Sequence, residues 1–385
     1  MTHSFTAVEL FCGAGGLSTG LRAAGFAVQA AYKFNPLAAA AMQANHPDVN
    51  VHTADVRQVD FRTHAGVTLV SGGPPCQPFS VGGAHTGQED PRDMFPQAIR
   101  AVREIRPAAF LFENVRGLLR AEFAAYLEYV QLQLAAPQVL RGDGESRAAH
   151  AARLRRPGGA PPNRYVVTGA LLDTADYGVP QTRERYFLVG LRADLNVTWT
   201  PPAPTHSAAA LAHARLHGHY QARHGLPFGR APATLFDLPP TLAAHVTVRD
   251  VLASLTGPDP QDRPGGARAY PGHTGSPPDL PAKTIKAGGN GVPGGENMYV
   301  SNDGQCHYFT NREAAAIQGF PPGYVFCGAR SDVMRQIGNA VPPLLARAVA
   351  RSVHAALKGA QCSSLASAAG AGGRLRSSRS AAASS

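Results

Sequence analysis

The first half of the chain alternates short apolar runs with stretches of helical periodicity. Apolar runs of this length, bounded by glycine, proline or polar residues, predict buried strands. The predicted strands are Thr6–Phe11, Ala27–Tyr32, Val67–Ser71, Ala108–Phe112, Tyr165–Ala170 and Arg185–Leu191. The predicted helices are Leu17–Ala24, Leu37–Asn45 and Met94–Ile105.

This alternation predicts the fold class. We expect an α/β fold built on a doubly wound, mainly parallel sheet of the Rossmann-like kind. In such sheets ligands bind beyond the carboxyl ends of the strands. Residues that directly follow predicted strands are therefore the first candidates for a functional site.

The pattern changes along the chain and predicts several regions. Residues 1–193 form the predicted sheet domain, with a mobile basic insertion at about 137–163. Residues 194–301 show few apolar periodicities and predict a smaller, loop-rich domain. Helical character returns in 302–358, which we expect to pack back onto the sheet. The Ala/Ser/Gly-rich residues 359–385 predict a disordered tail.

Composition and charge narrow the class of partner. The 385 residues include 36 Lys and Arg against 26 Asp and Glu, a net charge of +10. A basic balance favours a polyanionic partner, because each phosphate contact releases a counterion. Hydrophobic residues make up 44% of the chain, as in soluble globular proteins.

Cysteine usage and apolar runs indicate the compartment. The five cysteines are scattered, which predicts neither a structural zinc site nor a disulfide framework and suits a reducing compartment. His213 and His217 are spaced like some metal ligands but lack a cysteine or carboxylate companion, so no metal is expected. The chain shows neither a signal peptide nor an apolar run of about 20 residues that could span a bilayer. We expect a cytoplasmic protein without membrane contact.

Two glycine-rich segments lie at the ends of predicted strands. Glu9–Gly16 lies where a strand turns into a helix, so its backbone can approach a ligand closely. The same pattern would also suit a dinucleotide site or a simple tight turn. Gly72–Ser80 carries Cys76 between Pro-Pro and Gln-Pro. A buried structural thiol is the alternative there, but a rigid polar loop favours a reactive cysteine.

Six segments together resemble, in order, the motifs of the DNA cytosine-5 methyltransferase family of bacterial restriction–modification systems. The resemblance covers most of the chain outside the middle region and the tail. The matching segments are Phe11–Gly16, Pro75–Gln77, Glu113–Val115, Gln181–Arg185, Thr310–Pro321 and Gln336–Pro342.

The resemblance implies a covalent mechanism, with which the chemistry of the residues agrees. C5 of cytosine is a poor nucleophile, and addition of the Cys76 thiolate at C6 would raise its electron density. Glu113 would act as general acid toward N3. Arg183 and Arg185 would stand near the base and a phosphate or O2, where planar guanidinium groups suit bidentate contact.

The resemblance also implies S-adenosylmethionine as methyl donor. The residues expected to hold it are Phe11, Gly13, Ala14, Gly16, Asp55, Val56, Gly73, Pro75 and Asn339. Met94 is a candidate apolar contact to the adenine. One position departs from the family: Lys33 stands where relatives commonly have a glutamate that binds the ribose hydroxyls. A cation cannot accept those hydrogen bonds, so either Asn35 substitutes, the cofactor is held less tightly, or the chain is a weakened copy.

Residues 194–301 are expected to be the target-recognition region, with Lys283 and Lys286 as candidate phosphate contacts. The implied partners are double-stranded DNA and, as a candidate, a restriction endonuclease acting on the same site; a monomer is expected. Three alternatives stay open. They are an RNA cytosine methyltransferase, a non-catalytic DNA-binding protein that has lost its cofactor, and, least favoured, a dehydrogenase.

Overall fold

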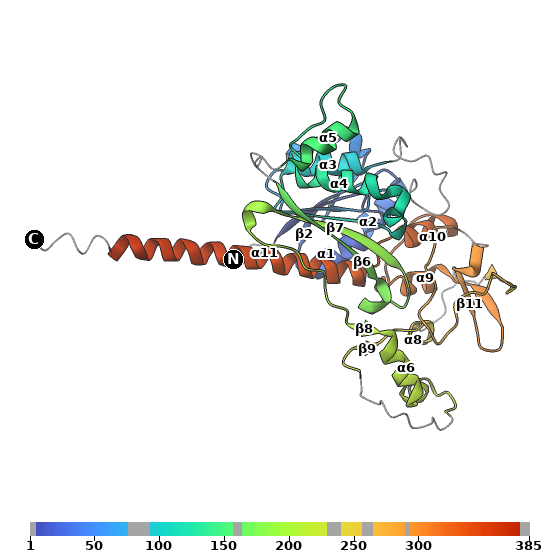
Figure 1. Cartoon of the computed structure of the whole chain (residues 1–385). Helices are drawn as coiled ribbons and strands as arrows, with labels where there is room; N and C mark the ends of the chain where they lie inside the picture. Colours follow the sequence, from blue (N-terminus) through green and yellow to red (C-terminus); the bar gives the residue numbers. More distant parts are fainter. Residues whose placement is uncertain are drawn as a thin grey trace, which may run out of the picture.

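A seven-stranded sheet forms the centre of the computed structural model, which describes residues 5–75, 93–156, 164–228, 240–255, 265–288 and 293–377 (Figure 1). The strand order is β3-β2-β1-β4-β5-β7-β6. The bounds are β1 (Thr6–Leu10), β2 (Ala27–Lys33), β3 (Asn50–Thr53), β4 (Leu69–Gly72), β5 (Ala109–Val115), β6 (Tyr165–Asp173) and β7 (Glu184–Arg192). Strands β1 to β5 pair in parallel, and β7 is antiparallel to both of its neighbours. The predicted mainly parallel sheet is confirmed.

Helices cover both faces of this sheet. They are α1 (Gly16–Ala23), α2 (Pro36–Asn45), α3 (Phe95–Ile105), α4 (Ala124–Ala135) and α11 (Pro343–Ser377). Because successive side chains of a strand point to opposite faces, β5 supplies both cores. Phe110 and Phe112 pack in the core with α3 and α4. Ala109 and Leu111 pack in the core with α1 and α11.

A third core lies outside the sheet. It joins Val248 and Ile285 to Phe309, Ile317 and Ile337. It therefore crosses the boundary predicted at residue 302, because α9 (Asn311–Ile317) and α10 (Arg330–Asn339) pack against the middle region, whereas α11 packs on the sheet. Sequence periodicity indicates an apolar face, but it does not say which partner that face meets.

The remaining elements are short. The middle region and its neighbours contain β8 (His206–Ser207), α6 (Ala208–Leu216), α7 (His219–His224), β9 (Ala243–Ala244), α8 (Val248–Ser254), β10 (Gly265–Gly266), β11 (Met298–Val300) and β12 (Cys306–Tyr308). Single 3-10 turns occupy Val56–Gln58, Phe61–His64, Arg116–Leu119, Ala121–Phe123, Thr174–Tyr177, Ala193–Leu195 and Pro293–Gly295. No described helix is both long and apolar enough to cross a membrane.

Two segments expected to be irregular contain helix. Within the insertion expected to be mobile, residues Arg147–Arg155 form the helix α5. Ser146 caps this helix by accepting a hydrogen bond from Ala149 N at 3.1 Å. Residues 157–163 of the insertion lie outside the described residues. Of the tail predicted to be disordered, residues 359–377 continue α11, which projects from the body of the molecule (Figure 1). Alanine has the highest helix propensity, so an Ala-rich composition favours a helix even where low complexity indicates disorder.

Close packing of α1 on α11 provides a test of the fold. A Cβ on Gly20 would lie 2.4 Å from Ala346 Cβ and 2.6 Å from Arg347 N, and the backbone of α11 cannot yield locally. We expect Gly20→Ala to lower the free energy of unfolding by roughly 1–3 kcal/mol, as measured by urea denaturation. Gly359→Ala is the matched control, because its Cβ would meet nothing within 4 Å. An equal effect of both substitutions would contradict this packing.

Candidate functional site

The candidate catalytic residues lie at the carboxyl edge of the sheet. β4 ends at Gly72, and Gly73-Pro74-Pro75 leads from it to Cys76, which lies outside the described residues. Glu113 is near the end of the neighbouring strand β5 and is 9% exposed. A Cβ built on Gly73 would lie 3.1 Å from Glu113 Oε2, so the Glu113 carboxylate faces the start of the Cys76 loop.

The environment of Glu113 shifts its ionisation. Burial raises the pKa of Glu113, and the nearby cations Arg185 and Arg183 oppose that rise. Arg185 Nε lies 2.8 Å from Glu113 Oε1, and both side chains are about one-tenth exposed. A buried carboxyl with a raised pKa can retain a proton to donate, which is the property a general acid needs.

Asn114 links the two strand ends. Its Nδ2 donates to the Pro74 carbonyl at 3.2 Å, and its Oδ1 accepts from Val115 N at 2.9 Å. Asn114 is 3% exposed, so the link is protected from water. The asparagine therefore holds the base of the Cys76 loop against β5. Sequence analysis identified Asn114 only as part of a motif, because the contact joins residues forty positions apart.

The two arginines of the Gln181–Arg185 segment have different surroundings. Arg185 pairs with Glu113 and belongs to the site. Arg183 is 3% exposed, and its terminal nitrogens donate to the carbonyls of Ile285 and Gly338 at 2.6 Å each. Arg183 thus joins β7 to the middle region and to α10. These bonds use both terminal nitrogens of Arg183, and its expected contact with base or phosphate stays a prediction.

Gln181 extends this connection. Its Nε2 donates to Gln318 Oε1 at 2.6 Å, and its Oε1 accepts from Ile285 N at 2.8 Å. Gln318 in turn donates to the carbonyls of Ile337 and Ala340. Both glutamines are fully buried. Sequence analysis gave neither side chain a role, since only the folded chain shows that they meet.

A cavity of about 300 Å³ opens beside the ends of β1, β2 and β3. Its lining consists of Phe11, Tyr32, Lys33, Phe34, Ala54, Asp55, Val56, Arg57, Pro75 and Met94. The structure therefore brings together four of the residues expected to hold the cofactor, and Met94 with them. Tyr32 and Phe34 were missed. Phe34 is 75% exposed, and a large aromatic side chain just after a strand was a signal that sequence analysis could have used.

The other residues expected to hold the cofactor lie outside this lining. Gly13 has open space around it at a φ of 57°. The Ala14 carbonyl accepts from the Tyr324 hydroxyl at 2.6 Å. Gly16 approaches the carbonyl of Val341 so closely that a Cβ would lie 2.3 Å from it. Gly73 faces Glu113, and Asn339 is exposed at the end of α10. The close approach to Val341 means that Gly16 packs directly against the C-terminal segment.

Lys33, the residue expected to depart from the family pattern, lines this cavity. Burial lowers the pKa of Lys33, and the charges of Cys12 and Glu9 oppose that shift. Asn35 does not line the cavity; its side chain caps α2 by accepting from Ala38 N at 3.0 Å. The cap explains Asn35 without a cofactor, which weakens the possibility that it replaces the usual glutamate.

Glu9 on β1 is buried near Lys33, and its ionisation makes the free energy of unfolding depend on pH. It is 1% exposed and accepts a hydrogen bond from Ser18 Oγ. Burial raises its pKa from 4.5 to about 8, against the opposing effects of Ser18 and Lys33. Between pH about 5 and 8, Glu9 is therefore protonated in the folded protein but ionised in the unfolded chain. The free energy of unfolding consequently falls as the pH rises through this range.

Glu9→Gln should remove this dependence while keeping an acceptor for Ser18. From pH 5.5 to pH 8 we expect the wild type to lose on the order of a few kcal/mol in free energy of unfolding relative to the variant. Urea denaturation at the two pH values measures the difference. Parallel losses in both proteins would show that Glu9 is already ionised at the lower pH.

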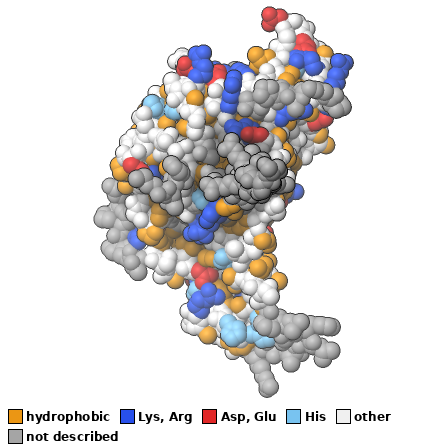
Figure 2. Space-filling view, turned by 90° about the vertical axis from the view of Figure 1, so that its left-hand side faces the viewer, with side chains coloured by type: hydrophobic (Ala, Val, Ile, Leu, Met, Phe, Trp, Pro, Cys, Tyr) orange, Lys and Arg blue, Asp and Glu red, His pale blue; other side chains and the backbone are white. Residues whose placement is uncertain are grey.

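Several histidines lie close together around α6. Histidine side chains gather at the lower end of the molecule, where α6 lies (Figures 1 and 2). The rings of His213 and His217 have centroids 4.2 Å apart. Within the described ranges, however, no group of three potential ligands is arranged around a common point.

Comparison with known proteins supports one family. The family described as C-5 cytosine-specific DNA methylase matches residues 5–136, 162–253 and 273–355. Type II methyltransferase M.NgoMIV of Neisseria gonorrhoeae is 32% identical, covering 92% of this chain and 98% of the relative. Type II methyltransferase M.NaeI of Lentzea aerocolonigenes is 31% identical, covering 92% of this chain and 76% of the relative.

Solved structures show the same fold. A putative DNA modification methyltransferase encoded within an Escherichia coli prophage superposes with a TM-score of 0.59 at 20% identity, covering 92% of this chain and 100% of that one. Dnmt2 of Spodoptera frugiperda superposes with a TM-score of 0.57 at 17% identity, covering 92% and 99%.

Proposed function

Because the chain belongs to the C-5 cytosine-specific DNA methylase family, we propose that it transfers a methyl group from S-adenosylmethionine to C5 of a cytosine flipped out of a specific DNA sequence. The type II methyltransferases among its relatives support a role in restriction–modification. A cognate endonuclease, a monomeric state and a cytoplasmic location stay predictions from the sequence.

One observation carries this proposal. Gly73 lies against Glu113, and Pro75 lines the cavity beside Phe11 and Met94. The three residues that precede Cys76 therefore connect the candidate general acid to the candidate cofactor cavity. A nucleophile on this loop would act between a proton donor and a methyl donor, as methylation of cytosine requires.

The cavity suits the adenosine part of the donor. The aromatic side chains of Phe11 and Phe34 offer apolar faces to a purine, and Asp55 offers a carboxylate. S-adenosylmethionine supplies an electrophilic methyl group on a sulfonium. Pro75, which lines the cavity, directly precedes Cys76 in the chain.

The proposed roles of the residues follow from this arrangement. The Cys76 thiolate adds to C6 while Glu113 gives a proton to N3, and the electron pair made available at C5 takes the methyl group. A base then removes the C5 proton, the thiolate is expelled from C6, and N3 returns its proton to Glu113. Arg185 orients Glu113, Asn114 holds the loop, and Arg183 positions the middle region relative to β7.

Bisulfite sequencing tests the proposed function. DNA from a methylation-free bacterial host expressing the chain should carry 5-methylcytosine in one recurring sequence, and DNA from a host expressing Cys76→Ala should not. An unmethylated genome, with soluble protein verified, would contradict DNA methylation and direct the same assay to RNA.

Lys33→Glu tests the cofactor site. A carboxylate at this position can accept hydrogen bonds from the ribose hydroxyls. Since hydrogen bonds to a charged group contribute about 1.5–3 kcal/mol, we expect S-adenosylmethionine to bind roughly tenfold more tightly by calorimetry. Lys33→Met, which removes the cation without adding an acceptor, should gain less. An unchanged or weaker dissociation constant for Lys33→Glu would mean that this side chain does not face the ribose.

A further inference from the structure

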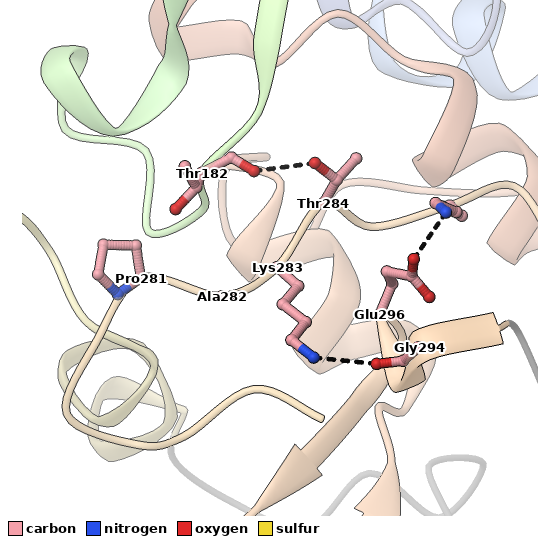
Figure 3. A pocket seen from close by; sticks show the side chains of 8 residues that line it. Thr182, Pro281, Ala282, Lys283, Thr284, Gly294 and Glu296 are labelled. Carbon is pink, nitrogen blue, oxygen red and sulfur yellow. Dashed lines mark hydrogen bonds and ion pairs between the residues drawn. The ribbon is translucent and has the colours of Figure 1, made fainter. Parts of the chain in front are cut away.

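A second cavity lies between the middle region and the loop that precedes β7. It is open to solvent and has a volume of about 520 Å³. Its lining consists of Thr182, Pro281, Ala282, Lys283, Thr284, Lys286, Gly294 and Glu296 (Figure 3). It shares no lining residue with the cavity proposed for the cofactor.

Hydrogen bonds hold this second cavity, called the groove below, in a fixed position beside the loop that precedes β7. Thr182 N donates to the Ala282 carbonyl at 2.9 Å, and Thr284 Oγ1 donates to the Thr182 carbonyl at 2.9 Å. Arg183, the next residue, donates to the Ile285 carbonyl. Since Arg185 pairs with Glu113 two residues further along, the groove adjoins the candidate catalytic centre.

The two lysines of the groove differ in charge balance. Lys286 Nζ lies 2.7 Å from Glu296 Oε1, and the Glu296 side chain is only 18% exposed. Lys283 Nζ instead donates to the Gly294 carbonyl at 2.9 Å (Figure 3). It also donates to Thr274 Oγ1 at 2.8 Å, and both acceptors are neutral. Within the described part of the chain no carboxylate pairs with Lys283. Its positive charge is therefore oriented but not neutralised.

We propose that Lys283 binds a backbone phosphodiester of the bound DNA, and that Lys286 does not, because Glu296 already balances its charge. This inference rests on the proposed function. The ammonium of Lys283 is held at two of its three donor positions, and the third remains for an anion in the groove. The exposed Thr182 side chain lines the same groove and offers a hydroxyl. Contacts of this kind fix the register of the duplex without reading its sequence.

The salt dependence of DNA binding distinguishes the two lysines. We would measure the dissociation constant of a duplex containing the methylated sequence by fluorescence anisotropy, over a series of NaCl concentrations. For Lys283→Gln we expect an affinity about threefold to tenfold weaker and a slope of log K against log[salt] smaller by about 0.9, the value for one phosphate contact. For Lys286→Gln, the matched control from the same groove, we expect an unchanged slope.

Several results would overturn the proposal. Equal slope changes in both variants would mean general attraction by the groove, and an unchanged slope in Lys283→Gln would mean that Lys283 meets no phosphate. Inorganic phosphate, added at constant ionic strength, should not displace DNA from the wild type; displacement that Lys283→Gln abolishes would assign the groove to free phosphate instead. Calorimetry with S-adenosylmethionine should give the same affinity for wild type and both variants, which shows that they are folded.

Failure of this proposal is distinguishable from failure of the proposed function. Methylation by the wild type with no change of slope in Lys283→Gln overturns the phosphate contact alone. A wild type that binds duplex DNA with the expected Lys283 effect but transfers no methyl group overturns the enzymatic function and leaves the contact supported. A wild type that binds no duplex overturns the phosphate contact whatever the methylation result.

Discussion

Cys76→Ala is expected to reduce methyl transfer to the assay background while DNA binding stays close to that of the wild type. The proposed reaction depends on a covalent bond from sulfur to C6, and an alanine side chain cannot form it. The substitution removes one sulfur from a loop whose base is held by other residues, since Asn114 bonds the Pro74 carbonyl. The contacts to DNA that we propose for Lys283 lie on other segments.

Three measurements separate these effects. Transfer from labelled S-adenosylmethionine reports activity, and anisotropy with duplex DNA reports binding. A duplex with fluorine at C5 of the target cytosine should hold the wild type in a complex that survives denaturation, because fluorine cannot leave as a proton does. Cys362→Ala is the matched control, since this cysteine is exposed on α11 and should be dispensable. Retained methylation by the Cys76→Ala variant would contradict the covalent mechanism.

Glu113→Gln is expected to lower kcat by about 10²–10⁴-fold, the usual contribution of general acid–base catalysis. Glutamine keeps the size of the side chain and a carbonyl acceptor for Arg185 Nε, which lies 2.8 Å from Glu113 Oε1. It has no proton to give to N3. The loss should therefore appear in kcat, with the dissociation constants of DNA and cofactor little changed.

The pH dependence gives an independent reading of the same residue. Burial raises the pKa of Glu113, so its protonated form persists to higher pH than for an ordinary glutamate and declines as pH rises through the shifted value. The fraction of Cys76 present as thiolate increases as the pH rises. A plot of the wild-type kcat against pH should therefore rise and then fall. Glu113→Gln should lose the alkaline decline, whereas an unaltered decline would assign it to another group.

The sequence by itself determined six of the seven strands of the main sheet, three of the helices that cover it and the order of the candidate motifs. Strand β1 was predicted as Thr6–Phe11 and is Thr6–Leu10, and α3 was predicted as Met94–Ile105 and is Phe95–Ile105. These elements depend on local periodicity, which neighbouring residues carry. β3 was missed because its four residues are half-buried or exposed and show no apolar run. The candidate roles of Cys76 and Glu113 likewise followed from their residue types within the recognised motifs.

Only the tertiary structure decided which residues meet. Arg183 and Arg185 are two positions apart in one motif, yet Arg183 holds the carbonyls of Ile285 and Gly338 while Arg185 pairs with Glu113. Lys283 and Lys286 are also near neighbours, and only Lys286 has a carboxylate at 2.7 Å. Such differences arise from partners about ten to more than one hundred positions away. Local propensity carries no information about those partners, because the energy of each contact exists only once the chain has brought the segments together.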